Sequence, residues 1–246
     1  MWSEVRPQVR TQELSFMTLA QPRSLQPDPS LAAAGLRLLD TYAGLAARGA
    51  HLLGRLLAGQ APQQWAHYPE DDAIDKSSGY QWFYHSHSPE DRPDAVEHGH
   101  IHLFARRPLW GRRLQSRSER AFAELCGNPS AKSTTRHLLS IGFNPKGLPV
   151  SLFTVNSWVT GDLMLGADLS LELLMSMKLG TGYPEIDAVI ESVTRLCESE
   201  LRELMWQRDD ALRSHSAADK LQDEALELLS EVRIDLDAKL SAFMTD

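Results

Sequence analysis

Six of the nine histidines of this chain lie within residues 67–102, and imidazole nitrogens at that density are ligands for transition metals. Five of the six alternate with other residues in two short runs, which are His85 and His87, then His98, His100 and His102. Side chains two residues apart on a strand point to the same face of a sheet. The spacing therefore predicts that each run lies on one face of its own strand.

Antiparallel pairing in one particular register brings the two runs together. If His85 stands opposite His100, then His87 stands opposite His98, and directly opposed Cβ atoms lie about 4.5–5.5 Å apart. A register shifted by one residue would place the two runs on opposite faces. We therefore predict a metal site on a β-ribbon, with all five histidines of the two runs as candidate ligands. Iron and zinc are the expected ions, because imidazole-rich sites disfavour calcium and magnesium.

Five imidazoles exceed one tetrahedral set of ligands. Either one or two of them support the others, or the site holds two ions. The opposing interpretation is that these histidines are polar side chains on a solvated face of a sheet. Two runs in the same phase on neighbouring strands favour the metal.

Other side chains near the two runs could complete the site. A ligating histidine usually donates its second ring N–H to a carboxylate or a carbonyl group. We expect four residues as further ligands or as partners of ligands, namely His67, Asp72, Glu97 and His137. Glu97 and Tyr84 are also the candidates for a catalytic role. The phase of His137 with Leu139 and Ile141 favours a core histidine over a ligand.

Arginines crowd the segment that follows the second histidine run, around Trp110. Arg106 and Arg107 come directly after that run and could steer an anion to the metal. The alternative is a solvated connection whose positive charges balance acidic helices.

Composition excludes several classes of protein. The chain has 246 residues, 42% of them hydrophobic, which is enough for a substantial core, and its formal net charge is −8. We do not expect nucleic acid as a partner of an acidic chain of this kind. Cys126 and Cys197 stand far apart, which excludes a disulfide scaffold and a four-cysteine zinc ribbon and suits a reducing cytoplasm. No apolar run of 18 residues and no secretory signal is present, so we expect a cytoplasmic protein without a membrane span.

The elements that must position the histidines follow from periodicity. Residues 1–28 are polar and rich in proline, and we expect a loosely ordered arm there. Leucines at helical spacing predict a helix over residues 30–59. Four strands are predicted next, over residues 79–88, 97–107, 136–143 and 149–158. Short connections between them favour an antiparallel meander.

The last third returns to a helical period. Helices are predicted over residues 168–179, 184–213 and 220–243, and the last two form a long hairpin. The hairpin packs on the sheet or on a second subunit, so a homodimer could form through it. The predicted fold class is α+β, with an N-terminal helix, a four-stranded antiparallel meander and a C-terminal long helical hairpin. The predicted division is an arm at 1–28, the histidine-bearing part at 29–165 and the C-terminal helices at 166–246.

Two motifs in the histidine region resemble an uncharacterised bacterial family. Tyr84-His85-Ser86-His87 is similar to its Y-H-x-H motif, and Glu97 to Phe104 is similar to its E-H-G-H-x-H-x-F motif. Residues 67–69 and 153–158 are similar to flanking parts of that family. The resemblance spans about residues 60–165, and it implies no activity.

A second, shorter resemblance is to the histidine-triad nucleotide hydrolases and transferases, whose motif alternates histidines with hydrophobic residues. Residues 98–104 follow this pattern, except that Gly99 stands at a hydrophobic position. The resemblance implies that His100 is a nucleophile that takes a nucleotidyl group. The glycine-and-glutamine lead-in of those enzymes is missing, and His85 and His87 have no role in that chemistry.

A third comparison, with the cupins, rests on His85, His87 and Glu97, which resemble the first metal motif of that fold. The spacing from His87 to Glu97 is longer than the cupin motif allows. What the likeness implies is a set of histidines with one carboxylate, which favours iron redox chemistry or zinc hydrolysis.

The sequence thus leads to three functional hypotheses. The first is a metal-dependent enzyme with an iron or zinc centre, acting on a small molecule, with anions among the candidates. The second is a metal-free nucleotidyl hydrolase or transferase that uses His100. The third is a non-catalytic metal carrier or sensor. An open coordination position would favour the enzyme, and a saturated site would favour the carrier.

Overall fold

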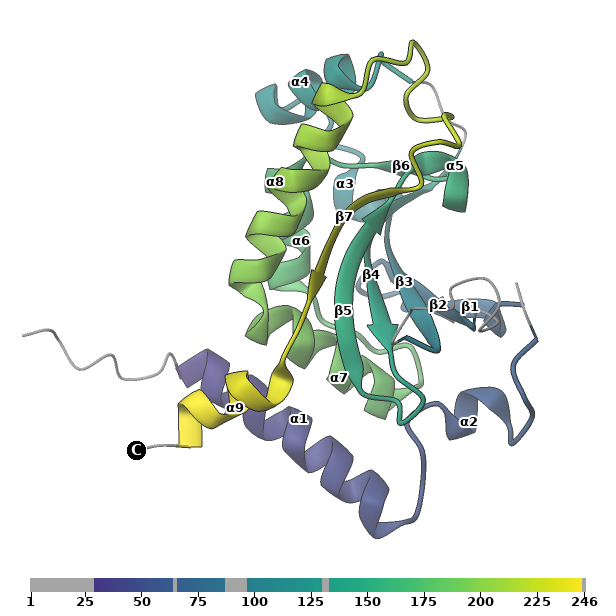
Figure 1. The fold of residues 1–246 in the computed structure, drawn as a ribbon, viewed down its shortest axis with the longest axis vertical. Coiled ribbons are helices and arrows are strands. Elements are labelled where there is room, and N and C mark those ends of the chain that lie inside the picture. The colour runs from purple at the N-terminus through teal and green to yellow at the C-terminus, as the bar shows by residue number, and fades with distance from the viewer. Residues whose placement is uncertain (1–28, 64–65, 87–96, 130–132, 245–246) are drawn as a thin grey trace, which may run out of the picture.

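The computed structural model describes residues 29–63, 66–86, 97–129 and 133–244. It is a mixed architecture in which helices lie against one antiparallel sheet (Figure 1). The helices are α1 (Pro29–Ala47), α2 (Gly54–Leu57), α3 (Arg107–Trp110), α4 (Arg117–Leu125), α5 (Ser157–Thr160), α6 (Ala167–Ser176), α7 (Pro184–Leu196), α8 (Glu198–Ser214) and α9 (Leu236–Met244). The strands are β1 (Tyr68–Ile74), β2 (Tyr80–Ser86), β3 (Gly99–Arg106), β4 (Thr135–Phe143), β5 (Pro149–Val155), β6 (Leu163–Met164) and β7 (Leu228–Arg233).

The sheet confirms the predicted antiparallel meander and extends it. Its main path runs β1-β2-β3-β4-β5-β7, with every neighbouring pair antiparallel, and the short β6 pairs parallel with β4. Strands β2 to β5 are the four that periodicity predicts. The predicted number of four strands is wrong, because the sheet has seven within the described residues.

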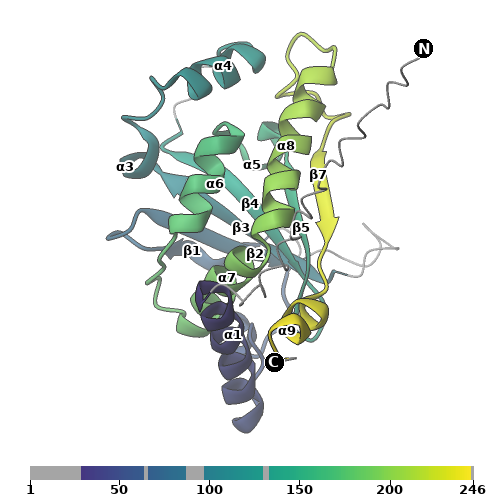
Figure 2. The same cartoon turned by 90° about the vertical axis from the view of Figure 1, so that its left-hand side faces the viewer.

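The face of the sheet that carries the core is covered by helices. Figure 2 shows this side, with α6, α7 and α8 in front of the strands. Alternate residues of the central strands, such as Trp82, Ile101 and Leu103, are fully buried in one cluster with side chains of α7 and α8. Burial of each large apolar side chain contributes about 1.5–3 kcal/mol. The indole N–H of Trp82 donates to Asp187 Oδ1 of α7 at 3.1 Å, which joins β2 to the helix layer.

The histidines of β2 and β3 occupy the intervening positions. Because side chains alternate along a strand, they point to the opposite face from Trp82, Ile101 and Leu103. The helix layer therefore holds the strands from one side, and the histidine face lies on the other.

The predicted C-terminal helical hairpin is wrong. Within residues 220–243 the chain forms β7 before it enters α9, and β7 pairs antiparallel with β5. A hydrogen bond of 2.7 Å joins the hydroxyl groups of Thr154 and Ser230 across this pair. The backbone of residues 228–233 thus finds its hydrogen-bond partners in a strand more than seventy positions earlier in the chain, which local periodicity does not encode.

Two other predicted helices are each divided in two. Gly49, with a φ of +58°, follows the end of α1, so the predicted helix over residues 30–59 becomes α1 and α2. A glycine in the left-handed region is a common helix terminator. The predicted helix over residues 184–213 is divided at Cys197, whose φ of −105° and ψ of 29° separate α7 from α8. The predicted helix over residues 168–179 corresponds to α6.

The predicted arm over residues 1–28 lies outside the described residues, as do His87 and most of the connection between the two histidine strands. No helix among the described residues is long and apolar enough to cross a lipid bilayer.

Candidate metal centre

The pairing of β2 with β3 has the predicted register. His85 stands opposite His100, and Phe83 stands opposite His102. The register is set by the core face, where Tyr84 opposes Ile101 and both side chains are fully buried. A shift by one residue would expose these apolar side chains and bury the histidines among helices.

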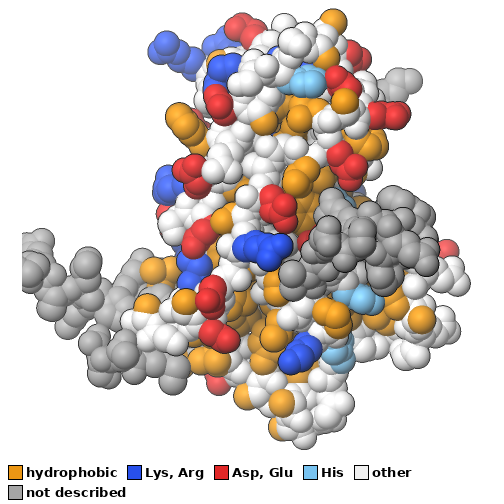
Figure 3. Space-filling view, viewed as in Figure 1, with side chains coloured by type: hydrophobic (Ala, Val, Ile, Leu, Met, Phe, Trp, Pro, Cys, Tyr) orange, Lys and Arg blue, Asp and Glu red, His pale blue; other side chains and the backbone are white. Residues whose placement is uncertain are grey.

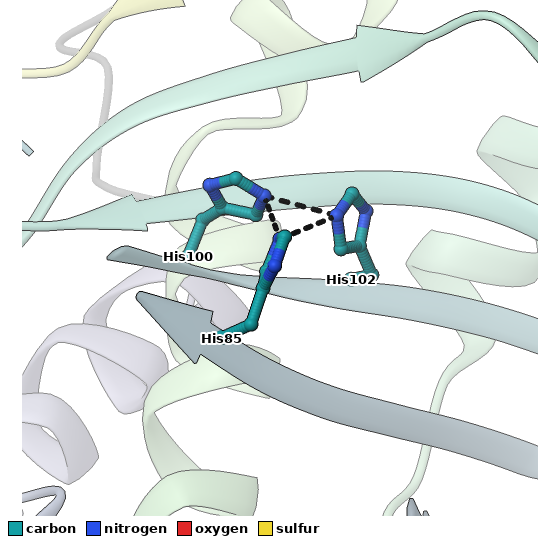
Figure 4. Close-up of side chains that lie close together, drawn as sticks. All are labelled: His85, His100 and His102. Carbon is teal, nitrogen blue, oxygen red and sulfur yellow. Dashed lines mark hydrogen bonds between the residues drawn. The ribbon is translucent and has the colours of Figure 1, made fainter. Parts of the chain in front are cut away.

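The rings of His85, His100 and His102 converge on one point (Figure 4). Their Nε2 atoms are separated by 2.6 Å for His85 and His100, 2.9 Å for His100 and His102, and 3.1 Å for His85 and His102. Each residue offers one nitrogen to the same small volume, so the three could hold a metal ion. We call these three residues the histidine trio.

The trio is buried, with exposed fractions of 8% for His85, 3% for His100 and 2% for His102. Burial and the neighbouring imidazoles lower the pKa of His102 well below its usual value. A neutral imidazole has an unprotonated nitrogen that can bind a metal, whereas an imidazolium has none. The surroundings of His102 thus favour the form that can act as a ligand.

The second nitrogen of His102 contacts two polar side chains of β4. Its Nδ1 lies 2.9 Å from Ser140 Oγ and 3.1 Å from His137 Nε2. If Nδ1 carries the ring proton, it can donate to either atom, and Nε2 is then left as an acceptor directed into the trio. Ser140 and His137 therefore fix the orientation of the His102 ring.

A β-bulge explains why His137 reaches this face. The register between β3 and β4 shifts between Leu103, opposite Leu139, and Phe104, opposite His137. The extra residue in β4 brings His137 to the face of His102, whereas unbroken alternation from Leu139 would place it in the apolar core. Burial lowers the pKa of His137 to about 3, so this imidazole is neutral. Its Nδ1 is buried and has no hydrogen-bond partner within the part of the chain that the structure describes.

A carboxylate lies behind His100. Glu97 Oε1 is 3.8 Å from His100 Nδ1, which is an ion-pair distance and too long for a direct hydrogen bond. The hydroxyl group of Ser151 donates to Glu97 Oε2 at 3.0 Å and holds the carboxylate beneath the ring. Glu97 thus lies next to the imidazole ring of His100.

Gly142 makes room for this carboxylate. It stands opposite His100 on β4, and a Cβ atom at this position would lie 2.2 Å from both Glu97 Oε2 and Ser151 Oγ. Any side chain larger than hydrogen would therefore displace Glu97, Ser151 or both.

His98 lies outside the trio. It is exposed and precedes the first residue of β3, where its Nδ1 lies 3.3 Å from the hydroxyl oxygen of Tyr84. The side chain of Tyr84 belongs to the core face, and burial raises the pKa of its hydroxyl group. The structure thus separates Tyr84 from the three converging nitrogens by the thickness of the sheet.

His67 and Asp72 lie at the edge of the site. His67 directly precedes β1, and Asp72 lies within that strand. The ring of His67 stacks on Phe83 with 3.6 Å between centroids, and its Nδ1 lies 3.1 Å from Asp72 Oδ1. Asp72 Oδ2 also accepts a hydrogen bond of 2.7 Å from the amide of Gln81. The side chain of His67 is 46% exposed. The His67–Asp72 pair therefore lies at the boundary between the site and solvent.

Aromatic rings surround the trio. Phe83 lies 5.2 Å from the ring of His102 and Phe153 lies 4.9 Å from the ring of His100, centroid to centroid. Phe104 stacks on Phe83 at 5.5 Å. These rings place apolar surface along the sides of the site, and electrostatic interactions are stronger in apolar surroundings than in water.

The two arginines predicted to steer anions follow the end of β3. Arg106 is half-buried, and Arg107 is exposed at the start of α3. Arg106 lies four positions after His102 on β3, which is about 13 Å along the backbone. Figure 3 shows basic side chains gathered near α4, while acidic and basic ones are mixed over the rest of that view.

Sequence reasoning missed three residues of the site. Ser140 and Ser151 are small polar residues in strands, and Gly142 follows two residues after Ser140. A signal was present, because Ser140, Gly142 and Ser151 interrupt apolar runs of β4 and β5 on the face opposite Leu139 and Ile141. Their partners across the sheet become visible only once the register is known.

The space beneath His100 can be tested by Gly142→Ala. We expect the free energy of unfolding to fall by about 1–3 kcal/mol, because the added methyl group overlaps Glu97 and Ser151. Urea denaturation followed by circular dichroism measures this change. Gly44→Ala in α1 is the control, since its Cβ would meet no atom closer than 3.4 Å and helix propensity favours alanine. A Gly142→Ala variant as stable as the parent would contradict the close packing of Gly142 against Glu97 and Ser151.

Comparison with known proteins gives a family and no activity. No curated protein and no solved structure matches the chain. One family model matches residues 32–234, described as a domain of unknown function, DUF6969. The expected resemblance to an uncharacterised family is thereby confirmed. The match covers most of the chain, from α1 to the end of β7, and the chain therefore belongs to the DUF6969 family.

Proposed function

We propose that the histidine trio binds one transition-metal ion through its three Nε2 atoms and that this centre is catalytic. The observation that carries the proposal is the convergence of three buried Nε2 atoms within 2.6–3.1 Å of one another. Unprotonated nitrogens at such distances direct their lone pairs at each other and repel unless a proton or a cation lies among them. A metal ion removes that repulsion.

The spacing of the nitrogens suits a small ion. Three nitrogens that bind one ion at 2.0–2.1 Å in tetrahedral directions lie about 3.4 Å apart. The trio is slightly tighter, so the rings would move apart a little on binding. Metal-ligating histidines usually contact a polar group through their second ring nitrogen. His100 has Glu97 at that position, and His102 has Ser140 and His137.

Zinc is our first choice of metal and iron the second. No carboxylate belongs to the converging group within the described residues, whereas non-haem iron sites commonly combine two histidines with one carboxylate. Three imidazoles are a known zinc set that leaves a fourth position for water or substrate. Zinc held in this way supplies a Lewis acid and activates water near neutral pH.

A fourth coordination position left free by the three histidines would favour an enzyme over a carrier. The apolar rings of Phe83 and Phe153 flank the trio, and a dry site strengthens the effect of a positive ion on a bound group. We propose a small molecule as the substrate, with Arg106 and Arg107 able to attract an anionic one. Iron oxidoreductase and zinc hydrolase are the two reaction classes that this set of ligands supports.

The histidine-triad hypothesis is disfavoured by the surroundings of His100. A nucleophile must reach phosphorus, but His100 is 3% exposed and its Nε2 lies within 2.9 Å of two other imidazole nitrogens. A metal carrier with a saturated site stays a second candidate, because burial of the trio would also slow the exchange of a bound ion.

Metal analysis of variants tests the proposed ligands. We expect about one zinc or iron ion per chain in the parent protein, and less than about a tenth of that after His85→Ala with His100→Ala, because one histidine cannot hold the ion. Plasma mass spectrometry measures the metal, and circular dichroism checks that the helices persist. His98→Ala is the matched control and should retain the metal, since His98 lies outside the trio. Full retention of metal in the double variant would refute this choice of ligands.

Chelation separates the two enzyme hypotheses. If His100 binds a metal, its lone pair is not available for attack on phosphorus. We therefore expect no chelator-resistant hydrolysis of adenosine phosphoramidates, measured by chromatography of the released nucleotide. Hydrolysis that survives chelation and is lost in His100→Ala would establish the histidine-triad reaction instead.

A further inference from the structure

A second candidate site lies on the helix side of the sheet, near α4 and β6. It is a cavity of about 110 Å³ with mainly apolar walls, formed by Leu114, Phe122, Ala123, Cys126, Pro129, Leu163, Met164 and Leu221. Two charged residues, Glu119 and Arg136, also line it. Arg136 directly precedes His137 on β4 and opposes Ala105 of the core face, so it lies across the sheet from the histidine trio.

Arg136 is held rigidly with part of its guanidinium group unused. The residue is 7% exposed, and its Cζ lies 4.0 Å from the centre of the Trp110 ring. Nη1 donates to the carbonyl oxygen atoms of Thr135 at 2.8 Å and Ser133 at 3.3 Å. Within the described residues, Nε and Nη2 donate to no acceptor. These two N–H groups form one edge of the planar fork, and that edge matches the two oxygens of a carboxylate.

The charge of Arg136 has no ion-pair partner among the described residues. Glu119 accepts hydrogen bonds of 3.0 and 3.2 Å from the backbone N–H of Gly166. Asp162 accepts a hydrogen bond of 2.6 Å from the hydroxyl group of Thr135. Burial lowers the pKa of Arg136, and these two carboxylates only partly oppose that effect. An arginine nonetheless stays charged in a protein, so an unpaired buried guanidinium is costly unless an anion joins it.

We propose that this cavity binds a small monocarboxylic acid, whose carboxylate accepts two hydrogen bonds from Nε and Nη2 of Arg136. The apolar part of the ligand packs against Phe122, Leu163 and Met164. A single negative charge fits better than a phosphate dianion, because Glu119 brings a carboxylate to the same cavity. The cavity is smaller than a drug-sized pocket of about 300 Å³ or more, which points to a short aliphatic or single-ring aromatic acid. This site is independent of the metal centre.

Isothermal titration calorimetry with acetate, butyrate, benzoate and inorganic phosphate tests the proposal. We expect saturable binding of one butyrate or benzoate per chain, weaker binding of acetate because it buries less apolar surface, and no saturable binding of phosphate. Arg136→Met should weaken benzoate binding by about tenfold or more, since a bidentate charged hydrogen bond is lost. Arg120→Met is the matched control, because Arg120 is exposed on α4 and does not line the cavity.

Two further variants make the test decisive even if Arg136→Met does not fold. Arg136→Lys keeps the positive charge but loses the planar fork, and should also weaken benzoate binding by about tenfold. Ala123→Leu fills the cavity and leaves Arg136 intact, so it should weaken benzoate more than acetate. The proposal is overturned if the parent protein binds neither butyrate nor benzoate saturably up to about 10 mM. It is equally overturned if phosphate binds as tightly as benzoate, or if none of these variants changes the affinity.

Discussion

The pairing register of β2 and β3 is the constraint on which the candidate metal centre depends. With His85 opposite His100, Tyr84 must stand opposite Ile101 and Trp82 opposite Leu103. These apolar pairs are fully buried against α7 and α8, and they contribute far more to stability than polar side chains do. The hydrophobic core thus fixes the register of β2 and β3. Because side chains alternate between the two faces of a strand, the same register also fixes which histidines stand opposite each other on the other face. The three imidazoles meet on the histidine face because the other face of β2 and β3 is packed against the helices in this register.

Local patterns predict the central strands well and the edges of the sheet poorly. Strands β2 to β5 alternate or run apolar, and short turns join β4 to β5, so their order and direction follow from the chain itself. By contrast, β1 is rich in acidic residues, and β7 has leucines that also fit a helical period. Pairing with β2 and β5 determines their conformation, and such non-local hydrogen bonds are not encoded in local sequence.

The same distinction applies to the site. Alternation predicts that His85, His100 and His102 share a face, and the structure brings these three together. It also predicts His98 on that face, but His98 precedes β3 and meets the hydroxyl group of Tyr84 instead. By its position His137 shares the phase of the core residues Leu139 and Ile141, and only a bulge in β4 brings it to the face of His102. Candidate metal ligands on regular strands are therefore predictable, whereas the residues that orient them depend on irregularities of the sheet. The histidine trio on β2 and β3 and the cavity next to Arg136 of β4 lie on opposite faces of the same sheet.

X-ray absorption spectroscopy of the protein loaded with one equivalent of zinc tests the central claim most directly, because it reports the atoms around the ion. The account predicts a first shell of nitrogen and oxygen at about 2.0–2.1 Å, with outer-shell scattering that fits three imidazoles per ion. That scattering should fall to the level of one imidazole or less, and the ion should be released, when His85 and His100 are both replaced by alanine. A zinc ion that binds with sulfur in its first shell, or without imidazole scattering, would contradict the assignment of His85, His100 and His102 as a metal centre.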